Sequence, residues 1–302
     1  MIYNVLKEGV NVYYLLAIIT ACVGGSTTIL KKNYVNNTKN VKRSNDIYIL
    51  VNIVAATLYF YFLAGTNVPI NLPTLIFSVV YALIGMLAVT VSLVSYNFAA
   101  VAYITVISGA LGTIIPFLYE LLFTDIVFSA GKITSVFFRI MAISVILLFN
   151  KKEKVSKTGV FLCVVLGLIS GAAGVTTRMY ATFPNVESDG SFFFWTNVFT
   201  LPMILISCLK KGSVKELVAD FKKIKKINYV YSLGSMVINN AITFVSIDIM
   251  RNISGTVYGI LSGSLGLIMA TIISLLVYKE RLSFKTLISV GLSIIAVVLS
   301  LL

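Results

Sequence analysis

Ten apolar segments, each about 20 residues long, divide this 302-residue chain almost from end to end. A helix of that length spans the hydrocarbon core of a bilayer, where each backbone polar group must find its partner within the segment. The sequence therefore predicts an all-α membrane protein with ten transmembrane helices, the first of them retained and not cleaved as a signal peptide. The segments are 12-31, 47-65, 75-97, 102-123, 132-150, 159-180, 191-209, 228-249, 255-277 and 284-302.

Composition agrees with a membrane protein and argues against a metalloprotein, a disulfide-linked protein and an enzyme. Hydrophobic residues make up 58% of the chain and charged residues 12%, about half the charged share of a soluble domain. Histidine is absent, and Cys22, Cys163 and Cys208 show no paired spacing, so neither a metal site nor a disulfide framework is indicated. No deep carboxylate pair provides for catalysis, so we expect no enzyme and no cofactor.

Two small-residue motifs occur twice, which indicates a duplication. Gly25-Ser26-Thr27-Thr28 is matched 149 residues later by Gly174-Val175-Thr176-Thr177, and Ser108-Gly109-Ala110-Leu111-Gly112 is matched 154 residues later by Ser262-Gly263-Ser264-Leu265-Gly266. Asn52 and Asn197, 145 residues apart, keep the same order. The sequence thus predicts two repeats, 1-150 and 151-302, of five helices each.

Basic residues set the expected orientation. Under the positive-inside rule the lysine-rich loops are cytoplasmic, which places both termini outside the cell membrane. The opposite side keeps only Lys7, Lys132, Arg178 and Arg251. The basic side carries 19 residues: Lys31, Lys32, Lys39, Lys42, Arg43, Lys151, Lys152, Lys154, Lys157, Lys210, Lys211, Lys215, Lys222, Lys223, Lys225, Lys226, Lys279, Arg281 and Lys285.

The loop charges also relate the halves. A repeat with five spans is followed by one that enters from the opposite side, so equivalent loops should differ in charge. The loop between the first and second segments is basic, while its counterpart between the sixth and seventh holds Glu187 and Asp189. The loop between the fourth and fifth segments has Glu120 and Asp125 near its start, while its counterpart between the ninth and tenth holds the basic cluster at Lys279. Inverted repeats of this kind are typical of secondary transporters, which open a central site to each side in turn.

The pattern resembles a known family. Five plus five spans, Gly-x-Thr-Thr ending the first helix of each half, and Lys279-Glu280-Arg281-Leu282-Ser283 after the ninth helix resemble the EamA-type branch of the drug/metabolite transporter superfamily. Its usual motif there begins with Gly, and an arginine common in its second helix is replaced here by Asn52 and Asn197. The resemblance implies a basket of helices, with helices 1, 3, 4, 6, 8 and 9 around a central cavity.

No Asp or Glu lies near the middle of any predicted span. Small multidrug-resistance relatives use a glutamate in the first helix to exchange a proton for a cation, and segment 12-31 has none. The sequence therefore favours a facilitator or exchanger. If transport does use protons, Asp248 and Glu120, which lie nearer the membrane interfaces, are the carboxylates that could bind and release them.

Deep polar side chains predict the substrate site. Adjacent asparagines on a helix point about 100 degrees apart, so one of Asn239 and Asn240 should line a cavity while the other packs. Neutral polar groups of this kind serve equally well as links between helices, and the two Ser-Gly-x-Leu-Gly motifs favour close helix packing. The candidate substrate-binding residues are Asn239, Asn240, Tyr81, Thr90, Tyr103, Ser108, Tyr258 and Ser262.

Two charged features complete the expectations. Glu120 and Arg139 lie at similar depth on either side of one hairpin, which favours a structural ion pair over an anion site. In segment 210-227 Val214, Leu217, Phe221 and Ile224 recur at helical spacing among lysines, which predicts an amphipathic helix on the membrane surface and not a nucleic-acid site.

These features predict a secondary transporter, a monomer or homodimer, for a small polar metabolite such as an amino acid, amine or sugar-like compound. The alternatives are a flippase or transporter of a lipid-linked or choline-like substrate, and a membrane enzyme or scaffold, for which the sequence offers no catalytic group. Membrane lipids and a small solute are the expected partners.

Overall fold

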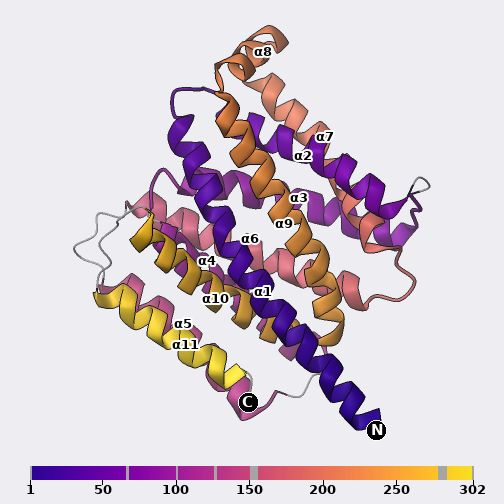
Figure 1. The fold of residues 1–302 in the computed structure, drawn as a ribbon, viewed down its shortest axis with the longest axis vertical. Helices are drawn as coiled ribbons and strands as arrows, with labels where there is room; N and C mark the ends of the chain where they lie inside the picture. The colour runs from indigo at the N-terminus through magenta and orange to yellow at the C-terminus, as the bar shows by residue number, and fades with distance from the viewer. Residues whose placement is uncertain are drawn as a thin grey trace.

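The computed structural model describes residues 2–65, 68–99, 101–125, 128–149, 156–277 and 284–300. Within these ranges the chain forms eleven α-helices and no β-strand. Figure 1 shows the long helices alongside one another, with the short α8 at one end and the N-terminus at the other. The helices are α1 (Ile2–Asn37), α2 (Ser44–Ala64), α3 (Leu72–Ser95), α4 (Val101–Phe123), α5 (Ala130–Phe149), α6 (Lys157–Thr182), α7 (Asp189–Lys210), α8 (Val214–Lys223), α9 (Lys226–Asn252), α10 (Gly255–Leu276) and α11 (Phe284–Ser300).

Each of the ten apolar segments coincides with one long helix to within a few residues, apart from α1, which is longer than expected at both ends. Among the described residues, seven helices are long and apolar enough to cross a membrane: α1, α2, α3, α6, α7, α9 and α10. Shorter apolar stretches lie at Ile107–Phe123 and Leu287–Ser300. The chain is thus an α-helical protein with the character of a multi-pass membrane protein.

Capping side chains fix where several helices begin. Asn71 Oδ1 accepts a hydrogen bond from Thr74 N at the start of α3, where Pro73 also occupies the first turn. Ser156, Ser188, Ser213 and Ser254 do the same for α6, α7, α8 and α10. Such caps satisfy backbone N–H groups that have no partner inside the helix, which ends the preceding loop at a defined residue.

Large apolar side chains cover the outside of the molecule. Phe62, Phe123 and Leu276 are about three-quarters exposed at 78%, 75% and 74%. A soluble protein rarely exposes so much apolar surface, whereas hydrocarbon solvates it without cost. Fully buried positions are often polar instead, among them Thr74, Ser78 and Ser235. This inside-out distribution places the polar chemistry of the chain in its interior.

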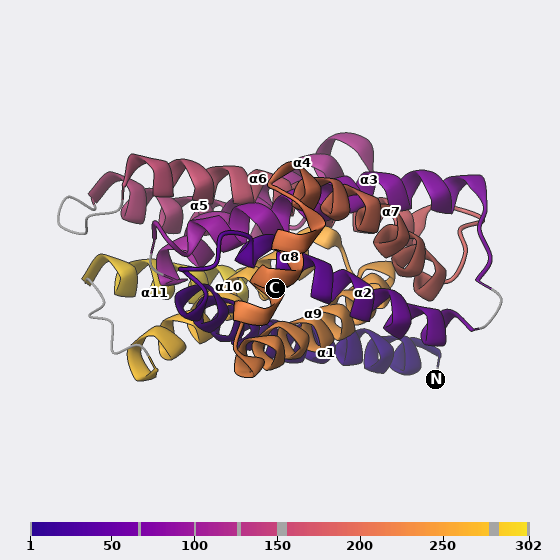
Figure 2. The same cartoon turned by 90° about the horizontal axis from the view of Figure 1, so that it is seen from above.

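The helices pack in a reciprocal pattern. α2 packs against α7, α4 against α10, and α5 against α11. α1 contacts α9 and α10, as α6 contacts α3 and α4. Seen from above, α3, α4 and α6 form one layer and α1, α9 and α10 the other, so each layer contains helices from both halves of the chain (Figure 2).

Ion pairs tie loops together at each end of the helices. At the end that carries α8, Lys211 Nζ contacts Asp46 Oδ2 at 2.7 Å and Arg43 contacts Glu216 at 2.7 Å. At the opposite end Arg251 pairs with Asp189. The loops that carry most of the described basic residues therefore meet at one end of the molecule.

The segment expected to form an amphipathic helix does contain α8, but its apolar face is oriented differently from the prediction. Leu217 and Ile224 are buried in a cluster with Tyr34 and Ile47, and Phe221 stacks on Tyr229. These side chains pack on the protein because Arg43 and its carboxylate partners hold α8 against the ends of α1 and α2. Of the large apolar residues on this helix, Val214 and Val218 remain exposed.

Candidate functional site

A central cavity of about 590 Å³ lies between α1, α2, α3, α4, α6, α7, α9 and α10. Its size is within the range of small-molecule sites. α2 and α7 contribute as well as the six helices that the family resemblance implies. Each of these eight helices contributes polar residues, whereas α5 and α11 contribute none to the described lining. The polar lining residues include Thr28, Lys31, Asn52, Tyr81, Ser92, Ser108, Ser170, Asn197, Ser235, Asn239, Asn240, Thr243, Tyr258 and Ser262.

The cavity brings together most of the expected site. Six of the eight candidate residues line it: Asn239, Asn240, Tyr81, Ser108, Tyr258 and Ser262. Thr90 is not part of the described lining, and its Oγ1 donates to the Met86 carbonyl 2.8 Å away within its own helix. The side chain of Tyr103 lies outside the described part of the structure.

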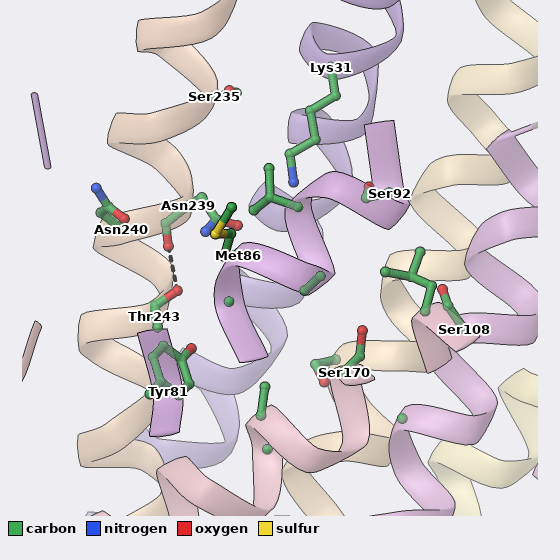
Figure 3. Close-up of a pocket in the computed structure, with 18 of the residues that line it drawn as sticks. Lys31, Tyr81, Met86, Ser92, Ser108, Ser170, Ser235, Asn239, Asn240 and Thr243 are labelled. Atoms are coloured by element: carbon green, nitrogen blue, oxygen red, sulfur yellow. Dashed lines mark hydrogen bonds between the residues drawn. The ribbon is translucent and has the colours of Figure 1, made fainter. Parts of the chain in front are cut away.

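The adjacent asparagines point in different directions. Figure 3 shows Asn239 projecting from α9 toward Met86 and the interior of the cavity, while Asn240 projects from the other side of the helix. The Asn240 amide nitrogen is buried without a hydrogen-bond partner among the described residues. The 100-degree step along a helix accounts for this divergence. Both asparagines line the cavity, and Asn239 is the one that projects toward its interior.

Asn52 and Asn197 make the same local hydrogen bond in the two halves. Asn52 Nδ2 donates to the Tyr48 carbonyl at 2.6 Å, and Asn197 Nδ2 donates to the Phe193 carbonyl at 2.7 Å. Asn52 also donates to Ser232 Oγ on α9 at 2.7 Å. Both asparagines line the cavity, so residues noted in the sequence only as marks of duplication belong to its wall.

The recurring glycine motifs meet where α4 crosses α10. A Cβ placed on Gly109 would lie 3.6 Å from the Gly263 Cα, and Thr113 Oγ1 donates to the Gly259 carbonyl at 3.1 Å. Gly109 and Gly263 are equivalent in the two motifs, 154 residues apart. Small residues allow this close approach of the two backbones, so the packing interpretation of the motifs is correct at this crossing, where both glycines also line the cavity.

Arg139 does not form the expected ion pair with Glu120. Its side chain is fully buried, its NH1 donates to Ser293 Oγ at 3.2 Å, and its Nε and NH2 have no partner among the described residues. The guanidinium occupies the space left by the missing side chains of Gly109 and Gly263, and a Cβ on Gly263 would overlap it.

Glu120 pairs instead with Arg178 of α6, at 3.4 Å from Oε1 to Nε. It also accepts hydrogen bonds from the backbone N–H groups of Gly255 and Thr256 at 2.6 and 3.0 Å. The prediction was wrong because similar depth on a hairpin does not decide which way two side chains face. The N-terminus of α10 offers a carboxylate free N–H donors and a favourable dipole, which the Arg139 position does not.

Lys31 is the charged residue of the described lining, and sequence reasoning missed it. It was counted as a loop charge, but α1 continues to Asn37, so Lys31 lies about 9 Å along the helix from its end. Figure 3 shows its side chain extending from α1 into the cavity toward the level of Asn239 and Met86. The absence of Gly or Pro from residues 32 to 37 was the available signal that the helix continues.

Aromatic side chains close part of the cavity wall. Tyr81 lies 5.4 Å from Phe192 and 6.0 Å from Phe193 between ring centroids, and Phe60 stacks on Phe193 at 5.0 Å. Tyr258 lines the same cavity from α10. These rings form part of the apolar wall of the cavity and add no charge to it.

The comparisons with known proteins bear on the fold. No protein-family model matches the chain, and no curated protein matches it. The chain is similar to a solved structure described only as "Crystal structure of protein", with a TM-score of 0.63 and 12% sequence identity over 93% of this chain and 96% of that one. At this identity the likeness shows a shared fold, which extends over nearly the whole of both chains.

Proposed function

We propose that this protein is a secondary transporter, a facilitator or exchanger that moves a small polar metabolite across a cell membrane by alternating access. The observation that carries the proposal is a cavity between eight helices, each of which contributes polar residues to it, in a bundle whose outer surface is apolar. Such a cavity can hold a polar solute at the depth of the bilayer. Ordinary protein interiors are close-packed and leave no space of this size.

Reciprocal packing supports the inverted-repeat architecture of the drug/metabolite transporter fold. Exchanging α1–α5 with α6, α7, α9, α10 and α11 converts each major helix contact either into itself, as for α2 with α7, or into another contact that also exists. Ser78 on α3 donates to the Phe192 carbonyl of α7, as Ser232 on α9 donates to the Tyr48 carbonyl of α2. Two related halves around a shared cavity can exchange conformations, which opens the cavity to each side in turn.

Replacing Asn239 with Ala should reduce transport about fivefold to tenfold at low substrate concentration, because one lost hydrogen bond to a ligand costs about 1 kcal/mol. Proteoliposomes would be tested for counterflow of tritiated amino acids, glucose and choline. Thr90→Val is the matched control, since its hydroxyl bonds within α3 and does not line the described cavity.

Counterflow of any of these solutes without movement of a fluorescent phospholipid supports a solute transporter. Lipid scrambling without solute counterflow would favour the flippase instead. Full activity of Asn239→Ala would remove Asn239 from the site. Membrane level and thermal stability of both variants should match the original protein, which separates a transport defect from a folding defect.

The end that carries α8 should face the cytoplasm. We expect an impermeant thiol reagent to label Pro184→Cys in intact cells and to leave Lys39→Cys unlabelled until the cells are opened, because basic loops stay inside. Both positions are exposed, and Cys163 and Cys208 are buried. A Cys22→Ala background removes the remaining native thiol of intermediate exposure. The reverse labelling pattern would place the termini in the cytoplasm.

A further inference from the structure

The cavity has an unbalanced positive charge. Lys31 is the charged residue of its described lining, and no Asp or Glu is present in that lining. Among the described residues no hydrogen bond or ion pair engages the Lys31 ammonium. An ammonium removed from bulk water is costly without an anion nearby, so the cavity is suited to a ligand that brings one.

The described acids near this end of α1 are already engaged. Asp46 contacts Lys211, and Asp220 contacts Lys223 at 3.1 Å with Arg43 at 4.0 Å. These pairs join α2, α7 and α8 outside the lining of the cavity. The charge on Lys31 is therefore left available to a ligand.

A second cation adds to the same field. Arg139 lies behind the α4–α10 crossing, with its NH2 against Gly109 and Gly263, and both glycines line the cavity. Its nearest described hydrogen-bond partner is the neutral Ser293, and Glu120 is occupied with Arg178. Two cations without described counter-ions make the potential in the cavity positive, and a low dielectric strengthens that effect.

We propose that the cavity recognises small organic anions, with Lys31 as the residue that binds their carboxylate. This inference rests on the proposed function and names its substrate class. Asn239, Thr243 and the serines around them supply neutral hydrogen bonds for the rest of the solute. Choline-like cations and free amines are disfavoured, because an unpaired ammonium already occupies the cavity and like charges repel.

Ligand binding to purified protein tests this without requiring transport. The probes are two acid–amide pairs, lactate with lactamide and benzoate with benzamide, together with inorganic phosphate and choline. We expect each acid to raise the apparent melting temperature more than its amide does, and choline to give no shift. A larger shift from phosphate than from either acid would replace the carboxylate with a phosphate group as the ligand.

Substitutions at Lys31 test whether this side chain binds the acids. Lys31→Met should weaken binding of the acids at least about tenfold, because a charge-assisted hydrogen bond is lost, while Lys31→Arg should retain most of it. Lys32→Met is the matched control: it removes the same charge one residue along, from a side chain outside the described lining. Unliganded melting temperatures of all three variants report folding separately.

Equal shifts from acid and amide, no shift from either acid, or unchanged acid binding in Lys31→Met would each overturn the proposal. The outcomes remain separate from those of the proposed function. Acid binding without counterflow of that same labelled acid in proteoliposomes would support anion recognition and remove transport, whereas counterflow of neutral solutes or cations would support transport and remove anion recognition.

Discussion

Glu120→Ala should lower the free energy of unfolding by about 3 to 5 kcal/mol, which is the cost of breaking a buried ion pair and leaving one charge unpaired. Glu120 is fully buried and joins three helices: it belongs to α4, pairs with Arg178 of α6 and caps the N-terminus of α10. Thr256 contributes both its N–H and its hydroxyl, at 3.0 and 2.5 Å. No other side chain in the described structure replaces these contacts.

Unfolding in detergent, followed by circular dichroism, measures this effect. Glu120→Gln should cost less than Glu120→Ala, because the amide oxygen still accepts from the α10 N-terminus. The exposed Asp125 provides the control, since Asp125→Ala should change stability by less than about 0.5 kcal/mol. In the double variant Glu120→Ala/Arg178→Met the loss should be smaller than the sum of the single losses, because no charge is left unpaired.

A loss below about 1 kcal/mol in Glu120→Ala would contradict the structural role given to this carboxylate. Strictly additive losses in the double variant would show that Arg178 and Glu120 do not interact. A large loss in Glu120→Ala together with strict additivity would return Arg139 to consideration as the partner of Glu120.

The sequence predicts the helices well because membrane solvation imposes a minimum length of apolar chain on each one. It also identifies much of the cavity wall, since polar groups deep in a span must face a cavity or another helix. Asn239, Ser108 and Ser262 were found in this way. These inferences need only the position of a residue along its helix.

Partner choice needs more than position along the helix. Glu120 was assigned to Arg139 on depth alone, but rotation about the helix axis directs it to α10 and Arg178. Lys31 was assigned to a loop because a 20-residue length was applied to a helix that continues to Asn37. Both errors concern charged residues, whose cost in a membrane depends on neighbours that the sequence order does not reveal.

The close contact of α6 with α4 was also missed, although Gly167 and Gly171 form a Gly-x-x-x-Gly pair in the printed sequence. A Cβ on Gly167 would lie 2.6 Å from Leu111 Cβ, and one on Gly171 would lie 2.7 Å from Ile115 Cβ. Both obstructing atoms are joined directly to the backbone of α4, so a rotamer change cannot move them.

The double variant Gly167→Ala/Gly171→Ala should therefore lose about 3 kcal/mol or more of stability, since overpacking costs typically 1 to 3 kcal/mol at each position. Gly291→Ala is the matched control, because nothing lies within 4 Å of the added Cβ in α11. Alanine is the better helix former, so Gly291→Ala should be neutral or stabilising by up to about 1 kcal/mol.

Transport should fall together with stability in this double variant. α6 lines the cavity through Ser170, Ala173 and Gly174, and displacement of α6 from α4 would change the shape of that wall. Detergent unfolding and proteoliposome counterflow measure the two effects. If the double variant were as stable as Gly291→Ala, the close approach of α6 and α4 would be wrong, because two added methyl groups cannot occupy the positions of Leu111 and Ile115 without moving a helix.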